Sequence, residues 1–73
     1  MRIACLTNKE VRVALNQLEK KGYKWASGDK PTGLYNSYDR MIIVVHENAK
    51  KLYMGDNYKD TVRTSKLYKN LLR

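Results

Sequence analysis

The sequence has few of the residues from which disulfide, metal and catalytic centres are built. A single cysteine, Cys5, excludes a disulfide within the chain, and with a single histidine, His46, no Cys/His cluster is spaced to hold zinc. No apolar run approaches the ~20 residues that a membrane-spanning helix needs, and the apolar stretch in residues 1–6 is too short for a secretory signal. We expect an untargeted, cytoplasmic protein that uses neither a metal nor a cofactor.

Acidic residues are scarce as well, with seven Asp and Glu against fifteen Lys and Arg, a formal net charge of +8 and a pI near 9.8. This balance favours attraction to nucleic acid or to another negatively charged surface. The 73 residues are expected to form one domain, and a chain this short buries only about 60% of the surface that it exposes when unfolded. Because little internal space is left for a catalytic cleft, we expect a binding module rather than an enzyme.

Phenylalanine is absent, and the aromatic residues are six tyrosines and one tryptophan. Four of these seven rings adjoin a lysine, in the segments Tyr23-Lys24-Trp25, Tyr58-Lys59 and Tyr68-Lys69. Lysine can contact phosphate while a ring stacks on a base, so the combination suits nucleic acid, although it suits an acidic protein surface equally well. We expect Trp25 and about half of the tyrosines to be buried. The candidates for stacking are Tyr35, Tyr38, Tyr53 and Tyr58.

The clearest predicted element is a helix that begins after Thr7 and ends at Gly22. Thr7 and Glu10 form a capping box, in which each side chain satisfies a backbone N–H at the start of the helix. Apolar residues at helical spacing predict one buried stripe, made of Val11, Ala14, Leu15 and Leu18. The opposite face is polar, with Lys9, Arg12, Asn16 and Lys20. Gly22 suits the left-handed conformation that ends a helix.

Alternating and β-branched segments predict four strands, at residues 2–6, 23–26, 41–45 and 51–54. The unbroken apolar run from Met41 to Val45 is typical of a central strand. Residues 47–50 predict a turn into the last strand, where Leu52 and Met54 would face inward and Lys51 and Tyr53 outward. Residues 27–33 predict a surface loop that Pro31 makes rigid.

From about Tyr58 onward, a weaker apolar stripe predicts a second helix. The order is then β-α-β-β-β-α, with the last three strands in an antiparallel meander. Because both amphipathic helices must bury their apolar stripes, we expect an α+β two-layer sandwich in which a small, mostly antiparallel sheet carries the helices on one face.

Two segments carry a resemblance to a known group of proteins. They are Lys21-Gly22-Tyr23-Lys24-Trp25-Ala26-Ser27-Gly28-Asp29-Lys30-Pro31 and, after a hydrophobic strand, Lys51-Leu52-Tyr53-Met54-Gly55-Asp56. Over residues 7 to 56 the chain resembles the small uncharacterised proteins common in bacteriophage and prophage genomes. Small phage-encoded proteins are often non-enzymatic effectors that block a host or defence protein, or that bind nucleic acid during replication and expression. The resemblance implies one of these two roles.

The predicted order of elements is also similar to that of double-stranded RNA-binding domains and of HicA-type mRNA-interferase toxins. In those toxins the catalytic histidine follows a Gly-Ser pair in the sheet. Here Ser27-Gly28 is followed by Asp29, and His46 lies at the far end of the next strand. This departure argues against ribonuclease activity, so we assign no catalytic residue. A HicA-like ribonuclease is the one enzyme hypothesis left open, and it predicts RNA cleavage that is lost in His46→Ala.

Other reactive groups have simpler interpretations. We expect His46 to be an ordinary strand-end residue, since its neighbour Glu47 points to the opposite face. Cys5, between Ile3 and Leu6, is expected to be a small core residue. The spacing of the loop carboxylates matches no metal site, which leaves turn-forming roles for Asp29, Asp39 and Asp56. The loop at Lys30 lacks the Gly-Lys-Ser/Thr pattern of nucleotide-binding loops.

Two groups of cations are candidates for a binding surface, one around the end of the first helix and one along the last helix. The candidate residues are Lys20, Lys21, Lys24, Lys30, Arg63, Lys66, Lys69 and Arg73. We predict a non-enzymatic, phage-type accessory protein whose basic surface contacts nucleic acid through phosphates, with little sequence preference. The alternative is an inhibitor that docks on an acidic host or anti-phage protein, and that can form a homodimer through sheet edges or the final helix.

Overall fold

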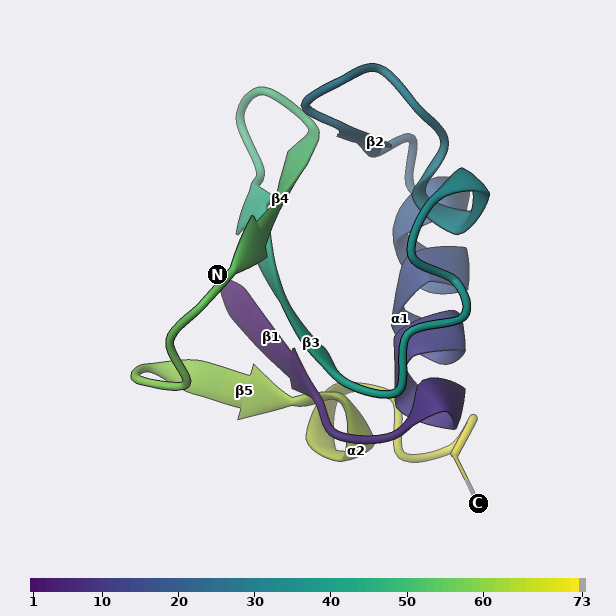
Figure 1. Ribbon diagram of the computed structural model, residues 1–73, viewed down its shortest axis with the longest axis vertical. Coiled ribbons are helices and arrows are strands. Elements are labelled where there is room, and N and C mark those ends of the chain that lie inside the picture. Colours follow the sequence, from purple (N-terminus) through teal and green to yellow (C-terminus); the bar gives the residue numbers. More distant parts are fainter. Residues whose placement is uncertain (73) are drawn as a thin grey trace.

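A mixed sheet of five strands carries helix α1 along one of its faces in the computed structural model, which describes residues 1–72 (Figure 1). In chain order the elements are β1 (Arg2–Cys5), α1 (Asn8–Lys20), β2 (Lys24–Trp25), the 3-10 helix η1 (Pro31–Gly33), β3 (Met41–His46), β4 (Lys51–Gly55), β5 (Thr61–Arg63) and α2 (Thr64–Leu67). The predicted α+β class is confirmed. Within residues 1–72, no helix is long and apolar enough to cross a membrane.

The strand order is β2-β4-β3-β1-β5, which differs from the predicted meander. β3 pairs antiparallel with both β1 and β4, whereas the edge strands β2 and β5 pair parallel with β4 and β1. The predicted pairing of β2 with β3 is therefore wrong. A hairpin needs a short turn, and residues 26–40 between these strands form a long connection that lets β2 lie outside β4.

The predicted second helix is too long. Its first part is strand β5, in which Val62 pairs with Ile3 of β1, and α2 covers only Thr64–Leu67. Without β5, the outer edge of β1 would have unpaired backbone groups, and the β-branched pair Thr61-Val62 suits a strand that fills this edge. Apolar spacing alone does not reveal this, because the edge to be filled is made by residues at the other end of the sequence.

Helix α1 begins and ends as predicted. The Thr7 hydroxyl caps it by accepting a hydrogen bond from the Glu10 backbone N–H at 3.2 Å, and Gly22 follows it with a φ of +87°. The predicted apolar stripe is buried, comprising Val11, Ala14, Leu15 and Leu18. The predicted polar stripe is exposed, comprising Lys9, Arg12, Asn16 and Lys20.

The main core lies between α1 and one face of the sheet. Alternate residues of β3 point into it, and Trp25 and Leu52 extend it toward β2; the β3 residues are Met41, Ile43 and Val45. The loop after β2 closes the side of α1, because the Trp25 indole N–H donates to the Pro31 carbonyl at 3.1 Å and the Thr32 hydroxyl donates to Glu19 at 2.7 Å. The loop predicted at residues 27–33 thus packs against the helix through a buried Pro31.

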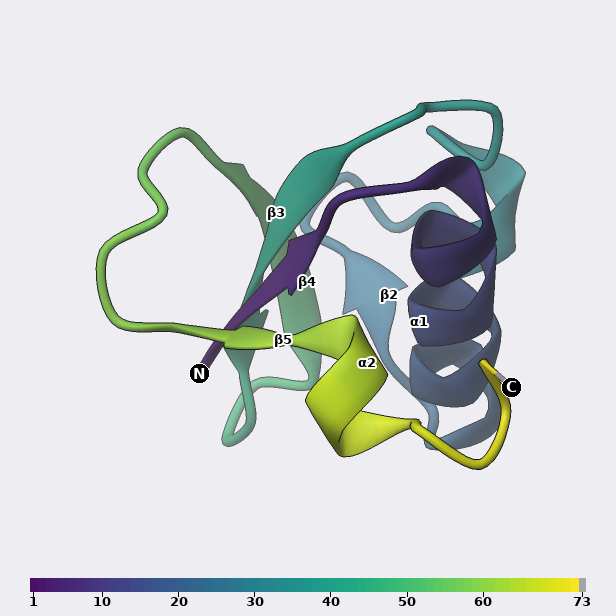
Figure 2. The same ribbon diagram turned by 90° about the horizontal axis from the view of Figure 1, so that it is seen from below.

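No helix within residues 1–72 covers the other face of the sheet. The connection from β4 to β5 bulges on this side, away from α1 (Figure 2). Ala4 and Ile42 are buried here, and a Cβ atom added to Gly55 would lie 2.8 Å from Ile42 Cγ2, which shows how closely β4 packs on β3. Met54 is exposed although it was predicted to face inward, because β2 pairs with β4 only as far as Leu52 and covers nothing beyond it.

Candidate nucleic-acid interface

The five strands contain cations but no acidic residue. No Asp or Glu occurs in β1 to β5, whereas each of β1, β2, β4 and β5 contributes one Lys or Arg. Alternation along the strands places most of these cations on the face away from α1. We call this surface the open face and define it by Arg2, Lys24, Val44, His46, Lys51 and Tyr53.

The strand register makes the open face continuous. Val44 has Arg2 opposite it on β1 and Tyr53 opposite it on β4. Lys51 has His46 on one side and Lys24 on the other. Three interstrand steps of ~4.8 Å separate β2 from β1, so the cations are distributed over ~14 Å across the sheet. This spread allows contact with several phosphates of one strand rather than with a single anion.

An aromatic pair lies within this row of cations. The rings of His46 and Tyr53 are diagonal neighbours, with centroids 4.8 Å apart and planes inclined by 61°. Tyr53 is 43% exposed and His46 is exposed, so both rings contact solvent. Of the four tyrosines predicted as stacking candidates, Tyr38, Tyr53 and Tyr58 are exposed, and only Tyr53 lies on the open face.

Several acids have partners elsewhere in the chain. Glu19 accepts hydrogen bonds from the Thr32 hydroxyl and backbone N–H, and these hold the pKa of its carboxyl below the ordinary value. Asp29 accepts a hydrogen bond from the Ser27 hydroxyl at 2.6 Å. Within residues 1–72 the sole ion pair joins Arg63 to Glu10, so the cations of the open face have no intramolecular counter-ion within 4.0 Å.

The acids nearest to the open face lie outside the strands. Asp56 and Asp60 belong to the connection between β4 and β5, and Asp56 borders a cavity with Arg40. Glu47 follows β3 and lines a groove on the α1 side, as expected for a residue pointing away from His46. The open face thus retains an excess of positive charge.

The predicted contact residues do not all meet in one place. Lys24 lies on the open face. Lys21 lines a groove of about 190 Å³ beside α2, together with Leu67 and Tyr68. Lys66 and Lys69 border the adjoining cavity along α2, so the structure brings the end of α1 close to the second predicted group. Lys20 is exposed in the last turn of α1.

Two predicted residues lie elsewhere, and a third falls outside the described part of the chain. Lys30 precedes η1, in the loop that packs beside Glu19. Arg63 ends β5, and its Nη2 atom lies 3.4 Å from Glu10 Oε1. Arg73 lies outside the described residues. Of the described candidates, Lys24 therefore lies on the open face, and Lys21, Lys66 and Lys69 lie beside α2.

Sequence reasoning missed Arg2, His46 and Lys51 as parts of one surface. Alternation within a strand shows that Lys51 and Tyr53 share a face, but it does not show which strands are neighbours. The pairs that assemble the open face join residues far apart in the sequence, such as Arg2 with Val44. The sequence also did not indicate a contact between a cation and an aromatic ring: the Lys50 Nζ atom lies 4.7 Å from the centroid of the Tyr23 ring.

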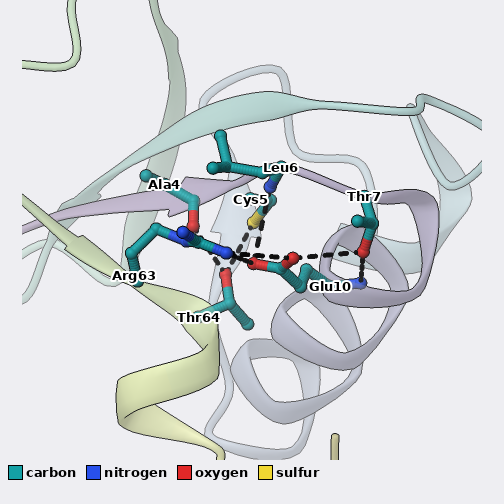
Figure 3. A network of polar contacts seen from close by, with 7 residues as sticks. All are labelled: Ala4, Cys5, Leu6, Thr7, Glu10, Arg63 and Thr64. Carbon is teal, nitrogen blue, oxygen red and sulfur yellow. Dashed lines mark hydrogen bonds and ion pairs between the residues drawn. The ribbon is translucent and has the colours of Figure 1, made fainter.

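Figure 3 shows the polar network that ties the C-terminal elements to β1. The Thr64 hydroxyl donates to the Ala4 carbonyl at 2.9 Å and lies 3.1 Å from Cys5 Sγ. The Glu10 carboxylate accepts from the backbone N–H of Leu6 and from Arg63. Because Thr64 and Glu10 are both buried, this network is structural, and Arg63 belongs to it rather than to the open face.

Comparison of the chain with protein-family models, with curated proteins and with solved structures finds no match. Among residues 1–72, no three His, Cys, Asp or Glu side chains are grouped so that they could hold a metal ion. The functional argument therefore depends on the geometry of the described surfaces.

Cys5 is expected to be unreactive in the folded protein. The pKa of its thiol is raised from 9.0 to about 11, mainly by burial; the hydrogen bond with Thr64 lowers it and the Glu10 carboxylate raises it by smaller amounts. Burial also raises the pKa of the neighbouring Tyr68 hydroxyl. Both groups favour the folded state while they are protonated, so the free energy of unfolding should fall as the pH rises from 9 toward 11.

This expectation is checked by titrating the thiol with 5,5′-dithiobis(2-nitrobenzoate) at pH 8 with and without denaturant, and by urea unfolding between pH 7 and 11. Slow labelling that becomes fast in denaturant is the expected result. The variant Cys5→Ala should show a shallower loss of stability above pH 9. Fast labelling of the native protein would contradict the buried position of Cys5.

Proposed function

We propose that this chain is a non-enzymatic, cytoplasmic accessory protein of the phage type that binds nucleic acid through its phosphates, using the open face. The observation that carries the proposal is the spread of three cations, Arg2, Lys24 and Lys51, over one face of four neighbouring strands that contain no acidic residue. Lys and Arg on such a surface attract the phosphate backbone without reading the bases. Little sequence preference is therefore expected from these contacts.

The free state of these cations supports the proposal. An ion pair inside the chain would have to break before a phosphate could bind, and the described residues place their one ion pair at Arg63. Arg2 and Lys24 are exposed and Lys51 is half-buried, so their charged ends have access to solvent. The formal net charge of +8 adds long-range attraction that brings a polyanion to this face.

The proposal predicts a steep dependence of binding on salt. With a fluorescein-labelled oligonucleotide, fluorescence anisotropy should give a binding constant that falls linearly with salt in a double logarithmic plot between 50 and 200 mM, and each phosphate contact contributes a slope of ~0.7 to 0.9. Replacement of both Arg2 and Lys51 by Ala should lower this slope by about 1.5 and weaken binding at least tenfold at the lowest salt.

The matched control removes two cations from the opposite side of the molecule. Lys9 and Arg12 are exposed on the outer face of α1, so the double variant Lys9→Ala/Arg12→Ala has the same net charge as the open-face variant. It should retain most of the binding and of the slope. Equal losses in the two variants would mean that net charge alone, and not the open face, governs binding. If the unaltered protein does not bind, the proposed function is wrong.

A second candidate function is docking on an acidic host or anti-phage protein. The observation that favours it is the groove beside α2, where apolar residues are accessible next to Lys21, and where Met1, Leu67 and Leu71 are exposed. A packed apolar contact would lose little affinity between low and moderate salt, unlike phosphate binding. Pull-down with and without nuclease treatment separates direct protein contact from bridging by nucleic acid.

A further inference from the structure

One border of the open face has features that phosphate binding does not use. A shallow recess of about 180 Å³ lies beside β4, where its lining includes Trp25, Leu34, Tyr35, Leu52, Tyr53 and Met54. Tyr53 is common to both surfaces, because its ring packs against His46 on the open face and the residue also lines the recess. The recess is thus an aromatic and apolar site at the end of a row of cations.

The backbone beside the recess is also available for contacts. β2 pairs with β4 only through Lys51 and Leu52, and the Ala26 backbone N–H donates to the Leu52 carbonyl at 3.0 Å as the last bond on this side. Beyond this point no strand of the described chain covers the outer edge of Tyr53–Gly55. N–H and C=O groups at an uncovered strand edge can bond a partner that lies flat against it.

We propose that the recess receives an unstacked base, and that the open face therefore binds single-stranded nucleic acid in preference to duplex. This inference builds on the proposed function, since the cations hold the backbone while Tyr53 meets the base. Bases inside a duplex are stacked on one another and cannot offer a ring face to a side chain, whereas those of a single strand can turn outward. The cations attract phosphate and the aromatic rings stack on bases, and single-stranded nucleic acid offers both.

The position of Tyr53 supports this ligand over a protein segment. An acidic peptide would satisfy the cations but gains no particular benefit from an exposed ring pair, whereas a base stacks on it. Lys51 is two residues from Tyr53 on the same face of β4, and Lys24 lies opposite Lys51. The phosphates on either side of a base that stacks on Tyr53 would therefore lie close to these two lysines.

The test measures the binding of two fluorescein-labelled probes of equal length, a thymidine 12-mer and a blunt 12-base-pair duplex, by anisotropy at one low salt concentration. The single strand should bind at least tenfold more tightly. The variant Tyr53→Ala should weaken single-strand binding by roughly 5- to 150-fold, the range for loss of one stacked base, and so bring the affinities for the two probes closer together. Tyr53→Phe should retain single-strand binding.

The control variant is Tyr58→Ala, which removes a tyrosine that is similarly exposed but lies in the connection between β4 and β5. It should not change the ratio of the two affinities. A far-ultraviolet circular dichroism spectrum that matches that of the unaltered protein shows that Tyr53→Ala is folded. Equal binding of both probes, or equal effects of the two tyrosine variants, would overturn the inference while the proposed function stands. Absence of binding to either probe would overturn both.

Discussion

The variant Trp25→Ala is expected to lose about 3 to 5 kcal/mol of the free energy of unfolding. For a chain of 73 residues the total is about 4 to 11 kcal/mol, so this single change should remove a third or more of the stability. Urea unfolding followed by far-ultraviolet circular dichroism measures the effect, because the variant has no tryptophan for fluorescence.

The large effect follows from the several contacts that Trp25 makes. Its side chain is buried in the main core, and its ring packs edge to face against Tyr35 with centroids 5.0 Å apart. Its indole N–H donates to the carbonyl of Pro31, which is also buried. Removal of the side chain leaves a cavity and detaches the loop of residues 26–40 from the core.

The variant Trp25→Phe separates these contributions. It keeps a ring in the core but leaves the Pro31 carbonyl without its hydrogen bond, which should cost about 1 to 3 kcal/mol. Tyr38→Ala is a further control, because Tyr38 is exposed at the outer end of the same aromatic chain and should lose less than 1 kcal/mol. Similar losses in Tyr38→Ala and Trp25→Ala would show that the loop, rather than the core, determines the effect.

The variant Glu10→Ala is expected to lose about 2 to 3 kcal/mol, the second largest effect. Glu10 accepts hydrogen bonds from the Leu6 N–H and the Thr7 hydroxyl, and it pairs with Arg63. Truncation removes the capping box of α1 and releases the end of β5 at the same time. Besides the unfolding curve, amide exchange in residues 61–67 should become faster than in the unaltered protein.

Two further variants divide the role of Glu10. Glutamine also serves in a capping box, so Glu10→Gln should lose less than about 1 kcal/mol. Arg63→Ala should lose a similarly small amount, because the Arg63 side chain is 48% exposed and an exposed ion pair contributes ~0 to 1 kcal/mol. If Arg63→Ala destabilised the protein as much as Glu10→Ala, the ion pair and not the helix cap would be the main contribution.

The parts of the fold that the sequence predicts are those set by neighbours along the chain. The capping box at Thr7, the buried stripe of α1 and the hairpin of β3 with β4 all involve nearby residues, and all are confirmed. The position of β2 beyond β4 and the existence of β5 were missed. Both depend on which strand edge is free, and that is settled only when distant segments pack together.

The candidate site follows the same division. Charge and aromatic content indicate the class of partner, because these depend on composition alone. The open face itself is made by pairing Arg2 with Val44, Val44 with Tyr53 and Lys51 with Lys24. No local pattern specifies these pairs. Conversely, Arg63 belongs to a cationic run in the sequence, and the fold removes it from the basic surface by placing it beside a buried carboxylate.

The parallel pairing of β5 with β1 affects how the chain can fold during synthesis. β1 occupies residues 2–5, yet its two partner strands begin at Met41 and Thr61. A ribosome must therefore add almost sixty further residues before β1 has a strand on both sides. Until then one edge of this apolar strand stays unpaired, which exposes the growing polypeptide to association with other chains.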